Sequence, residues 1–192
     1  MYLSCLLLAA GQSRRFAGIK QLARVNGQPL INTTVDNYLS VNIDDILLIL
    51  GANADKIAPV LPRQLSTFVS KKWQGGMGNS LADAMTQVSA KATHVLVGLA
   101  DQPGITKTAI ESLITGSRRE PDKIVASTFA EVVGAPAIFP QQFFCELAAL
   151  NGDKGAKLII QQHLAQVVTV EIPAAQWDID TREDLDTWLN KR

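Results

Sequence analysis

The clearest candidates for chemistry in this chain lie in a short cationic loop that follows the apolar run Tyr2–Ala10. The loop begins at Gly11 and carries three positive charges, on Arg14, Arg15 and Lys20. Small residues let a ligand approach the backbone closely, and successive N–H groups in such a turn can hold an anion. Arginine offers a planar fork of donors and lysine a point charge, and both suit phosphate. The loop is therefore predicted to bind a polyphosphate.

Two better-known phosphate-binding motifs are absent from the sequence. The chain contains neither G-x-x-x-x-G-K-[ST] nor G-x-G-x-x-G, so the loop is neither a P-loop nor a dinucleotide-binding turn. Taken by itself, such a loop is more often a solvated loop of Gly, Ser and Arg residues than a phosphate site.

Three aspartates in two other parts of the chain are candidate metal ligands. Asp101 lies just past the apolar run Thr93–Leu99, and Asp178 and Asp180 share one side of an extended segment. Magnesium prefers one or two carboxylates together with substrate phosphates, so Asp101 is a plausible ligand. In the alternative interpretation, Asp101 caps a turn and the segment 178–181 is a helix-capping cluster.

Three further segments are rich in glycine. The block Trp73–Ser80 precedes a helical pattern, and a glycine-rich helix start offers free N–H groups to an anion. The segments Gly134–Pro136 and Gly152–Ala156 resemble a strand entrance and a turn that starts a helix. Each is equally well explained as a plain turn. His94 and His163 lie in no metal-ligand or catalytic-triad spacing, and we expect both to be structural.

The elements that must position these residues alternate along the chain. Strands are expected at Tyr2–Ala10, Asp45–Leu50, Ser66–Val69, Thr93–Leu99, Ile124–Ser127, Ala135–Phe139 and Val167–Val170. Helices are expected at Pro29–Val41, Ala54–Leu61, Gly78–Ala90, Lys107–Thr115, Pro140–Leu150, Asp153–His163 and Arg182–Lys191. Continuous apolar strands alternating with helices indicate one α/β domain over residues 1–192, with a mostly parallel sheet between helix layers. Ligands in such folds bind beyond the carboxyl ends of the strands, which is where four of the segments above fall.

The composition excludes several classes of protein. Hydrophobic residues make up 47% and charged residues 19% of the 192, which is typical of a globular domain that needs no disulfides. Lys plus Arg and Asp plus Glu each number 18, so a net basic surface for nucleic acid or anionic membrane is not expected. The apolar stretch Leu3–Ala10 is too short for a membrane span and lacks a basic flank. Cys5 and Cys145 are expected to be buried core thiols, which fits a cytoplasmic protein.

The motifs together resemble those of a known family. Leu8-Ala-Ala-Gly-x-Ser-x-Arg15 followed by Lys20 is similar to the signature loop of the nucleotidyltransferases with the nucleotide-diphospho-sugar transferase fold. The similarity is greatest to MobA-like enzymes and, among these, to molybdenum cofactor cytidylyltransferases. Four further blocks occur in the family's order and extend the resemblance over nearly the whole chain: Trp73–Ser80, Leu99–Pro103, Gly134–Pro136 with Gly152–Gly155, and Asp178–Thr181.

The resemblance implies a three-layer α/β/α fold and a role for each block. It implies catalytic roles for Arg15 and Lys20 and binding of Mg²⁺ by Asp101 and Asp180. The implied nucleotide-binding residues are Leu8, Ala9, Ala10, Gly11, Ser13 and Arg14 in the loop, and Gly76, Met77, Gly78 and Ser80 around the base and ribose. The implied acceptor-binding residues are Gly134, Pro136, Gly152, Asp153 and Gly155.

The loop departs from the family pattern at one position. The family usually has glycine where this chain has Ala17, and Gly18 comes one residue later. Lys20 keeps its expected distance from Arg15, so we expect the charges to keep their places while the backbone path between them changes.

The expected reaction is transfer of a nucleoside monophosphate from a triphosphate to a phosphate-bearing acceptor, with release of pyrophosphate. Ala10, where guanylyl-transferring relatives tend to have glycine, favours CTP, and the resemblance then implies molybdopterin as acceptor and a molybdoenzyme as downstream partner. The alternatives are guanylyl transfer to the same pterin, or transfer to a sugar phosphate or methylerythritol phosphate. An alternative of another class is a nucleotide-binding regulator without catalysis.

Overall fold

A seven-stranded sheet in the order β5-β4-β1-β6-β8-β7-β9 forms the centre of the fold. The structure is a computed structural model that describes residues 1–191. Within this sheet only β8 runs antiparallel to its neighbours, so the mostly parallel sheet expected from the sequence is confirmed. The strands are β1 (Leu3–Ala9), β4 (Asp45–Leu50), β5 (Ser66–Val69), β6 (His94–Leu99), β7 (Ile124–Phe129), β8 (Val132–Pro140) and β9 (Val167–Glu171).

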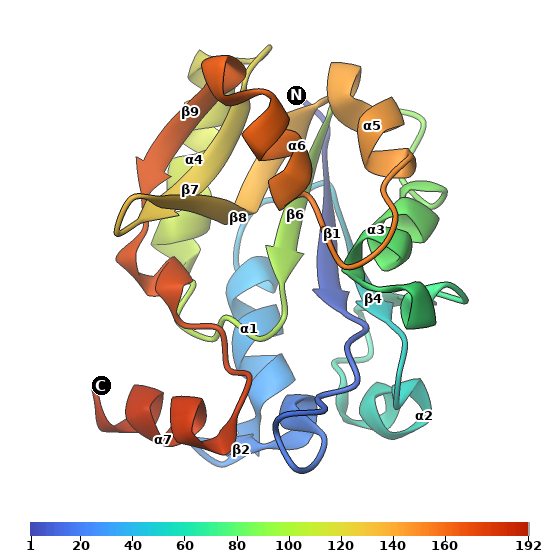
Figure 1. The fold of residues 1–192 in the computed structure, drawn as a ribbon, viewed down its shortest axis with the longest axis vertical. Coiled ribbons are helices and arrows are strands. Elements are labelled where there is room, and N and C mark those ends of the chain that lie inside the picture. The colour runs from blue at the N-terminus through green and yellow to red at the C-terminus, as the bar shows by residue number, and fades with distance from the viewer. Residues whose placement is uncertain (192) are drawn as a thin grey trace.

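Helices cover both faces of the sheet (Figure 1). The α-helices are α1 (Leu30–Leu39), α2 (Ala54–Ile57), α3 (Met77–Met85), α4 (Lys107–Arg119), α5 (Phe144–Ala148), α6 (Lys157–Gln162) and α7 (Arg182–Asn190). Short 3-10 helices lie at Lys20–Leu22, Ala58–Val60, Trp73–Gly75, Gln141–Phe143, Leu164–Gln166 and Pro173–Gln176. None of the helices in the described part of the chain is long and apolar enough to cross a membrane.

The central strand β1 shows why the fold has three layers. All seven of its residues are buried, and successive side chains of a strand point to opposite faces. Cys5 and Leu7 belong to the hydrophobic cluster on the side of α1 and α4, whereas Leu6 and Leu8 belong to the cluster on the side of α3, α5 and α6. The apolar run without alternation therefore matches a strand that helices cover on both sides.

A third, smaller cluster ties the C-terminal helix to the N-terminal loop. Phe16 of the loop packs with Ile179, Leu185 and Trp188 of the C-terminal segment. Figure 1 shows α7 outside the two helix layers, near the loop and β2. Thr181 caps this helix with a full capping box, in which Asp184 is the partner residue.

Several element boundaries differ from the predicted ones. The strands β2 (Arg24–Val25) and β3 (Gln28–Pro29) form a short hairpin that the sequence analysis missed. Both of its turn residues, Asn26 and Gly27, have positive φ, as an Asn-Gly hairpin turn requires.

Several helices also begin or end away from their predicted limits. Pro29 does not lie in the first turn of α1, because its extended backbone belongs to β3 and precedes the helix. Helix α6 begins at Lys157, so the predicted start at Asp153 is wrong, and α4 continues to Arg119. Helix α3 ends at Met85, five residues before its predicted end at Ala90.

The two cysteines differ in burial. Cys5 is fully buried in β1, as expected, and burial, with a smaller contribution from the charge of Asp45, raises the pKa of its thiol. Cys145 is exposed on α5, so the expectation of a core thiol is wrong there. The reason is that this five-residue helix turns Leu147 inward and leaves Cys145 on its solvent side.

Candidate active site

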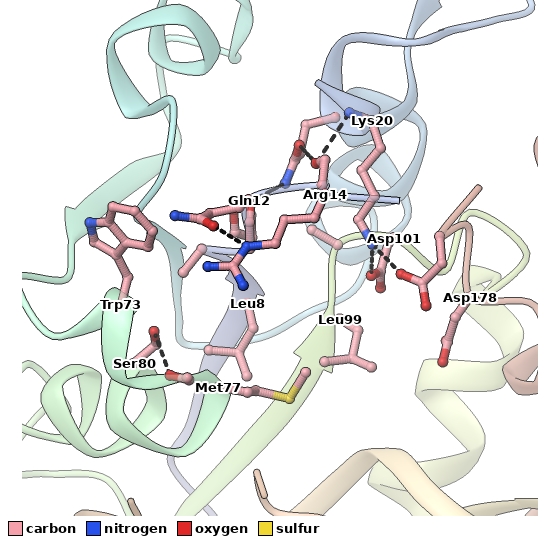
Figure 2. Close-up of a pocket in the computed structure, with 18 of the residues that line it drawn as sticks. Leu8, Gln12, Arg14, Lys20, Trp73, Met77, Ser80, Leu99, Asp101 and Asp178 are labelled. Carbon is pink, nitrogen blue, oxygen red and sulfur yellow. Dashed lines mark hydrogen bonds and ion pairs between the residues drawn. The ribbon is translucent and has the colours of Figure 1, made fainter. Parts of the chain in front are cut away.

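The carboxyl ends of β1 and β6 border a cavity of about 700 Å³. Four segments that are far apart in the sequence contribute to its lining: the loop from Leu8 to Arg15, the start of α3, Asp101 after β6, and Asp178 and Asp180 near the end of the chain. Figure 2 shows Lys20, Asp101 and Asp178 on one side of this cavity, with Trp73 and Ser80 on the opposite side. The site thus lies at the sheet edge where ligands of open α/β folds bind.

Lys20 joins the two aspartates that the resemblance implies as metal ligands. Its ammonium Nζ lies 2.6 Å from Oδ2 of Asp101 and 2.8 Å from Oδ1 of Asp180. The Arg15 guanidinium lies 2.6 Å from the other oxygen of Asp180. The backbone N–H of Ile179 donates to the carbonyl of Asp101 at 3.0 Å. This bond fixes the C-terminal segment beside the end of β6, and the predicted cations and acids form one cluster.

Charge and burial determine the protonation of this cluster. Burial alone would lower the pKa of Lys20, but the charges and hydrogen bonds of Asp101 and Asp180 outweigh it and raise that pKa. Partial burial of the Asp178 carboxyl, together with the charges of Asp101 and Asp180, raises the pKa of Asp178 to about 6. Gln102 and Lys20 oppose that rise. The lysine is therefore held charged, while the third carboxyl titrates nearer neutrality.

The donor set suits a divalent cation that is also bound by phosphate. Oδ1 of Asp101 is buried and accepts no hydrogen bond from the residues that the structure describes. A buried carboxylate oxygen without a partner is costly unless a cation or donor reaches it. Within residues 1–191 no group of three or more His, Cys, Asp and Glu side chains is arranged to hold a metal ion. A metal at Asp101 and Asp180 would thus need phosphate oxygens to complete its shell, as Mg²⁺ commonly does.

A buried glutamine that the sequence analysis did not single out braces the loop. The Gln21 amide lies 3.3 Å from the carbonyl of Ala9 and 3.4 Å from that of Gly11, and its oxygen accepts from the Ser13 hydroxyl at 3.0 Å. The same hydroxyl accepts from the backbone N–H of Lys20 at 3.3 Å. These contacts hold both ends of the loop together. No sequence motif marked Gln21.

The loop accommodates its departure from the family pattern by local strain. Ala17 has a φ of 52°, in the left-handed region that favours glycine, and Gly18 has a φ of 149°. Phe16, which is 1% exposed, lies beneath the Arg182 guanidinium at 5.1 Å. Its burial fixes the path between Arg15 and Lys20, so both cations reach Asp180.

The glycine block before α3 and the segment 151–155 pack together as one unit. A Cβ at Gly78 would lie 2.6 Å from the carbonyl of Lys154, and the N–H of Gly78 donates to Gly152 at 2.9 Å. Gly76 has a φ of 106°, and a Cβ there would lie 2.5 Å from a carboxylate oxygen of Asp153. Both glycines permit a contact that larger residues would prevent. Gly76, Met77 and Ser80 line the cavity, whereas Gly78 is buried and does not line it.

A second cavity of about 460 Å³ adjoins the first. The two share Leu8, Met77, Leu99, Asp153 and Asp178, and much of the second is lined by apolar residues, including Val97, Phe129 and Val132. Of the residues implied for the acceptor, Gly134, Asp153 and Gly155 line this cavity, whereas Pro136 and Gly152 line neither.

Other cavity residues were missed by sequence reasoning. Gln12 accepts a hydrogen bond from Nε of Arg14 at 2.5 Å, and Figure 2 shows this pair in the middle of the cavity. Gln102 donates to the carbonyl of Ala175 at 3.1 Å and borders the second cavity. Trp73 lines the first cavity and packs against Gly51. A Cβ added at Gly51 would lie 2.6 Å from the Cβ of Trp73. All three residues lie within motifs described above, Gln12 in the loop, Trp73 in the block Trp73–Ser80 and Gln102 in the block Leu99–Pro103, but no role was predicted for any of them.

Comparison with known proteins identifies the family. Residues 5–167 match the model of the MobA-like NTP transferase domain. The chain belongs to this family. The transferase is 28% identical to nicotine blue oxidoreductase of Paenarthrobacter nicotinovorans, over 95% of this chain and 91% of that protein. It is 25% identical to the purine catabolism protein PucB of Bacillus subtilis (strain 168), over 96% and 95% of the two chains.

Solved structures extend the similarity to the whole chain. A homologue of Mycobacterium tuberculosis Rv0371c from Mycobacterium sp. strain JC1 has a TM-score of 0.84 and 30% identity, over 98% of this chain and 96% of that one. Rv0371c from M. tuberculosis H37Rv in complex with manganese has a TM-score of 0.85 and 25% identity, over the full length of both chains. CMP:2-keto-3-deoxy-manno-octonic acid synthetase complexed with CTP has a TM-score of 0.78 at 13% identity and shares the fold.

These comparisons confirm the nucleotide-diphospho-sugar transferase fold and place the chain among MobA-like nucleotidyltransferases. The family match ends at residue 167, before Asp178 and Asp180. The similarity of the mycobacterial structures continues through that C-terminal segment.

Proposed function

We propose that this transferase moves CMP from CTP to a phosphate-bearing acceptor, molybdopterin, and releases pyrophosphate. The observation that carries the proposal is a cluster of two cations and two acids at a cavity that the glycine-containing loop lines. The cluster consists of Arg15, Lys20, Asp101 and Asp180. A triphosphate requires cations, close backbone approach and a metal-binding pair of acids, and the site offers all three. A molybdoenzyme would receive the product.

The chemistry is attack by an acceptor phosphate oxygen on the α-phosphorus, with pyrophosphate as the leaving group. The protein's task is to hold the reactants in line and to neutralise charge that develops on the phosphates. Arg15 and Lys20 would neutralise the triphosphate and the departing pyrophosphate. Asp101 and Asp180 would hold Mg²⁺, which supplies further charge neutralisation when bound.

Each part of the two cavities has a proposed role. The triphosphate and ribose would lie against the loop and the start of α3, contacting Leu8, Ala9, Ala10, Gly11, Ser13, Arg14, Gly76, Met77 and Ser80. The acceptor would occupy the second cavity beside Gly134, Asp153 and Gly155. Gly78, Pro136 and Gly152 would act indirectly, because they shape the walls without lining either cavity.

The nucleotide and metal assignments rest on separate supports. Ala10 favours CTP over GTP, and a protein of the same fold is complexed with CTP. A divalent metal is favoured by the carboxylate pair and by the manganese complex of a mycobacterial homologue. Mg²⁺ is proposed because two carboxylates plus phosphates suit it.

The decisive assay measures pyrophosphate release by the purified chain with Mg²⁺, molybdopterin and each of CTP, GTP, ATP and UTP. We expect release with CTP and none when EDTA removes the metal. Release with GTP only would reject the cytidylyl assignment, and release only with methylerythritol phosphate or a sugar phosphate would reassign the acceptor. Tight nucleotide binding without release in the presence of any of these acceptors would favour a regulator.

Lys20→Ala tests the role of the central cation. The variant is expected to keep the fold and to lower turnover by about 10²-fold or more, the range for loss of one electrostatic donor. Lys107→Ala is a matched control, because Lys107 pairs with Glu111 on the exposed surface of α4. Turnover of Lys20→Ala close to that of Lys107→Ala would exclude the proposed role.

A further inference from the structure

Lys20 occupies the position between the two carboxylates that a bridging metal ion would take. Its ammonium is within 2.8 Å of an oxygen of both Asp101 and Asp180, and the residue is only 8% exposed. Arg15 takes the second oxygen of Asp180. Of the four carboxylate oxygens, only Oδ1 of Asp101 has no hydrogen-bond partner within residues 1–191. The pair is therefore already neutralised by the protein's own cations.

A metal ion held between the oxygens that face Lys20 competes with the Lys20 ammonium. Two positive groups on the same oxygens repel each other strongly, and a buried ammonium that loses its counter-ions is strongly disfavoured. The ammonium can leave only when another anion receives it. The triphosphate proposed to lie along the loop provides that anion.

We propose that Lys20 acts as an internal cation that keeps the metal site closed until a triphosphate draws its ammonium away. The inference rests on the proposed function, in which Asp101 and Asp180 hold the metal. Metal and triphosphate then bind cooperatively. By thermodynamic linkage, each raises the affinity of the other by the same factor.

The backbone at Lys20 is held by hydrogen bonds, whereas its side chain can change partner. The Lys20 N–H is bonded to Ser13, which is itself bonded to the buried Gln21. The lysine side chain has four flexible carbons that can carry its ammonium to a new partner. The backbone stays in place, and the ammonium passes from carboxylate to phosphate.

Arg15 does not serve as the same kind of block. Its side chain is 73% exposed, so solvent can replace Asp180 when the guanidinium leaves. It also touches only one of the two aspartates. Displacement of the Lys20 ammonium is therefore the unfavourable step when a metal ion binds the two aspartates.

The test measures binding of Mn²⁺ alone by electron paramagnetic resonance, with no nucleotide present. Lys20→Met, which keeps a long flexible side chain but removes the charge, is expected to bind Mn²⁺ at least about tenfold more tightly than wild type, within the usual range of coupling between sites. Arg15→Met is the matched control and is expected to change Mn²⁺ affinity much less. Equal or weaker Mn²⁺ binding by Lys20→Met would overturn the proposal.

A double variant, Lys20→Met with Asp101→Asn, separates failure of this proposal from failure of the proposed function. If the double variant loses Mn²⁺ binding, the ion binds at these carboxylates. Retention of Mn²⁺ binding by that double variant would instead overturn the metal assignment on which both proposals depend. If Mn²⁺ binding requires Asp101 but Lys20→Met does not raise the Mn²⁺ affinity, the Lys20 proposal alone fails and the metal assignment stands.

A measurement on the wild-type protein covers the case in which Lys20→Met does not fold. The ¹⁵N resonance of the Lys20 ammonium is expected to stay unchanged when Mg²⁺ alone is added. It should shift when Mg²⁺ and CTP are added together, as the ammonium moves from carboxylate to phosphate. A shift with Mg²⁺ alone, or none with the two together, would contradict the proposal.

Discussion

Gly11 offers a test of ligand approach that is separate from folding. It is exposed at the start of the loop, and a Cβ placed there would meet no protein atom within 4 Å. Gly11→Ala should therefore leave the fold unchanged. The added methyl would occupy space that the proposed triphosphate needs, and we expect about tenfold weaker CTP binding, equivalent to about 1.4 kcal/mol.

Isothermal titration calorimetry with CTP checks this expectation, with circular dichroism to verify the fold. Gly134→Ala is a suitable control, because a Cβ at Gly134 also meets nothing within 4 Å and this residue borders the second cavity. Unchanged CTP affinity in Gly11→Ala would mean that the nucleotide does not approach the loop backbone at that point.

At the residue scale, the sequence predicted which charged residues lie together, but not the residues that hold them in place. Lys20, Asp101 and Asp180 meet as the motif resemblance implied. Gln21 carries no motif, and its importance comes from burial and from partners that only the folded loop supplies. The exposure of Cys145 was mispredicted for a related reason, since the solvent side of a short helix depends on tertiary packing.

Asp180, the proposed metal ligand, lies just before the N-cap of helix α7, so this cap connects stability with the proposed function. The Thr181 hydroxyl accepts from the N–H of Asp184 at 3.1 Å, and the Asp184 carboxylate accepts from the N–H groups of Asp180 and Thr181. Thr181→Ala removes half of this capping box. The expected loss in the free energy of unfolding is about 1 kcal/mol.

Chemical denaturation of the two variants Thr181→Ala and Thr181→Ser provides the measurement. Serine keeps the hydroxyl that caps the helix, so Thr181→Ser should remain close to wild type. If both variants lose the same stability, the effect comes from the methyl group and the cap contributes little.

The contact of α3 with the segment 151–155 gives a second prediction at the scale of elements. Gly78→Ala would force a Cβ to within 3.0 Å of three backbone carbonyl oxygens, those of Asn151, Gly152 and Lys154. Backbone cannot move aside as a flexible side chain can, so we expect a loss of about 1–3 kcal/mol in unfolding free energy, as for other overpacked sites. Urea unfolding at constant pH measures it. If Gly78→Ala is as stable as wild type, the segment 151–155 can shift to accommodate the added methyl group.

Element boundaries show what local sequence can and cannot predict. The strands of the central sheet were predicted within a few residues, because each is a short apolar run between polar turns. The start of α6 was misplaced because the segment before it packs against Gly76 and Gly78, a contact invisible in the local sequence. The Asn26-Gly27 hairpin, by contrast, carried a local signal that was overlooked.

At the scale of the whole molecule, His94 links the sheet to a connecting segment. It begins β6, its Nε2 lies 2.9 Å from the carbonyl of Pro121, and its Nδ1 lies 2.9 Å from the Thr93 hydroxyl. A carbonyl can only accept, so Nε2 carries the hydrogen. Burial lowers the pKa of His94 below its ordinary 6.5, although the Pro121 carbonyl and Asp122 oppose the shift. The folded protein therefore favours the neutral imidazole.

This lowered pKa predicts a contribution to stability that disappears in acid. The unfolded state takes up a proton near pH 6.5, before the native state does, so the unfolding free energy falls as the pH decreases through that value. His94→Gln cannot bind this proton. The stability advantage of wild type over His94→Gln should thus be larger at about pH 7.5 than at about pH 5.5. Urea unfolding of both proteins at the two pH values measures it, and because every other titrating group is common to both, the difference isolates His94. An advantage that stays constant or grows in acid would show that His94 is not held neutral by the fold.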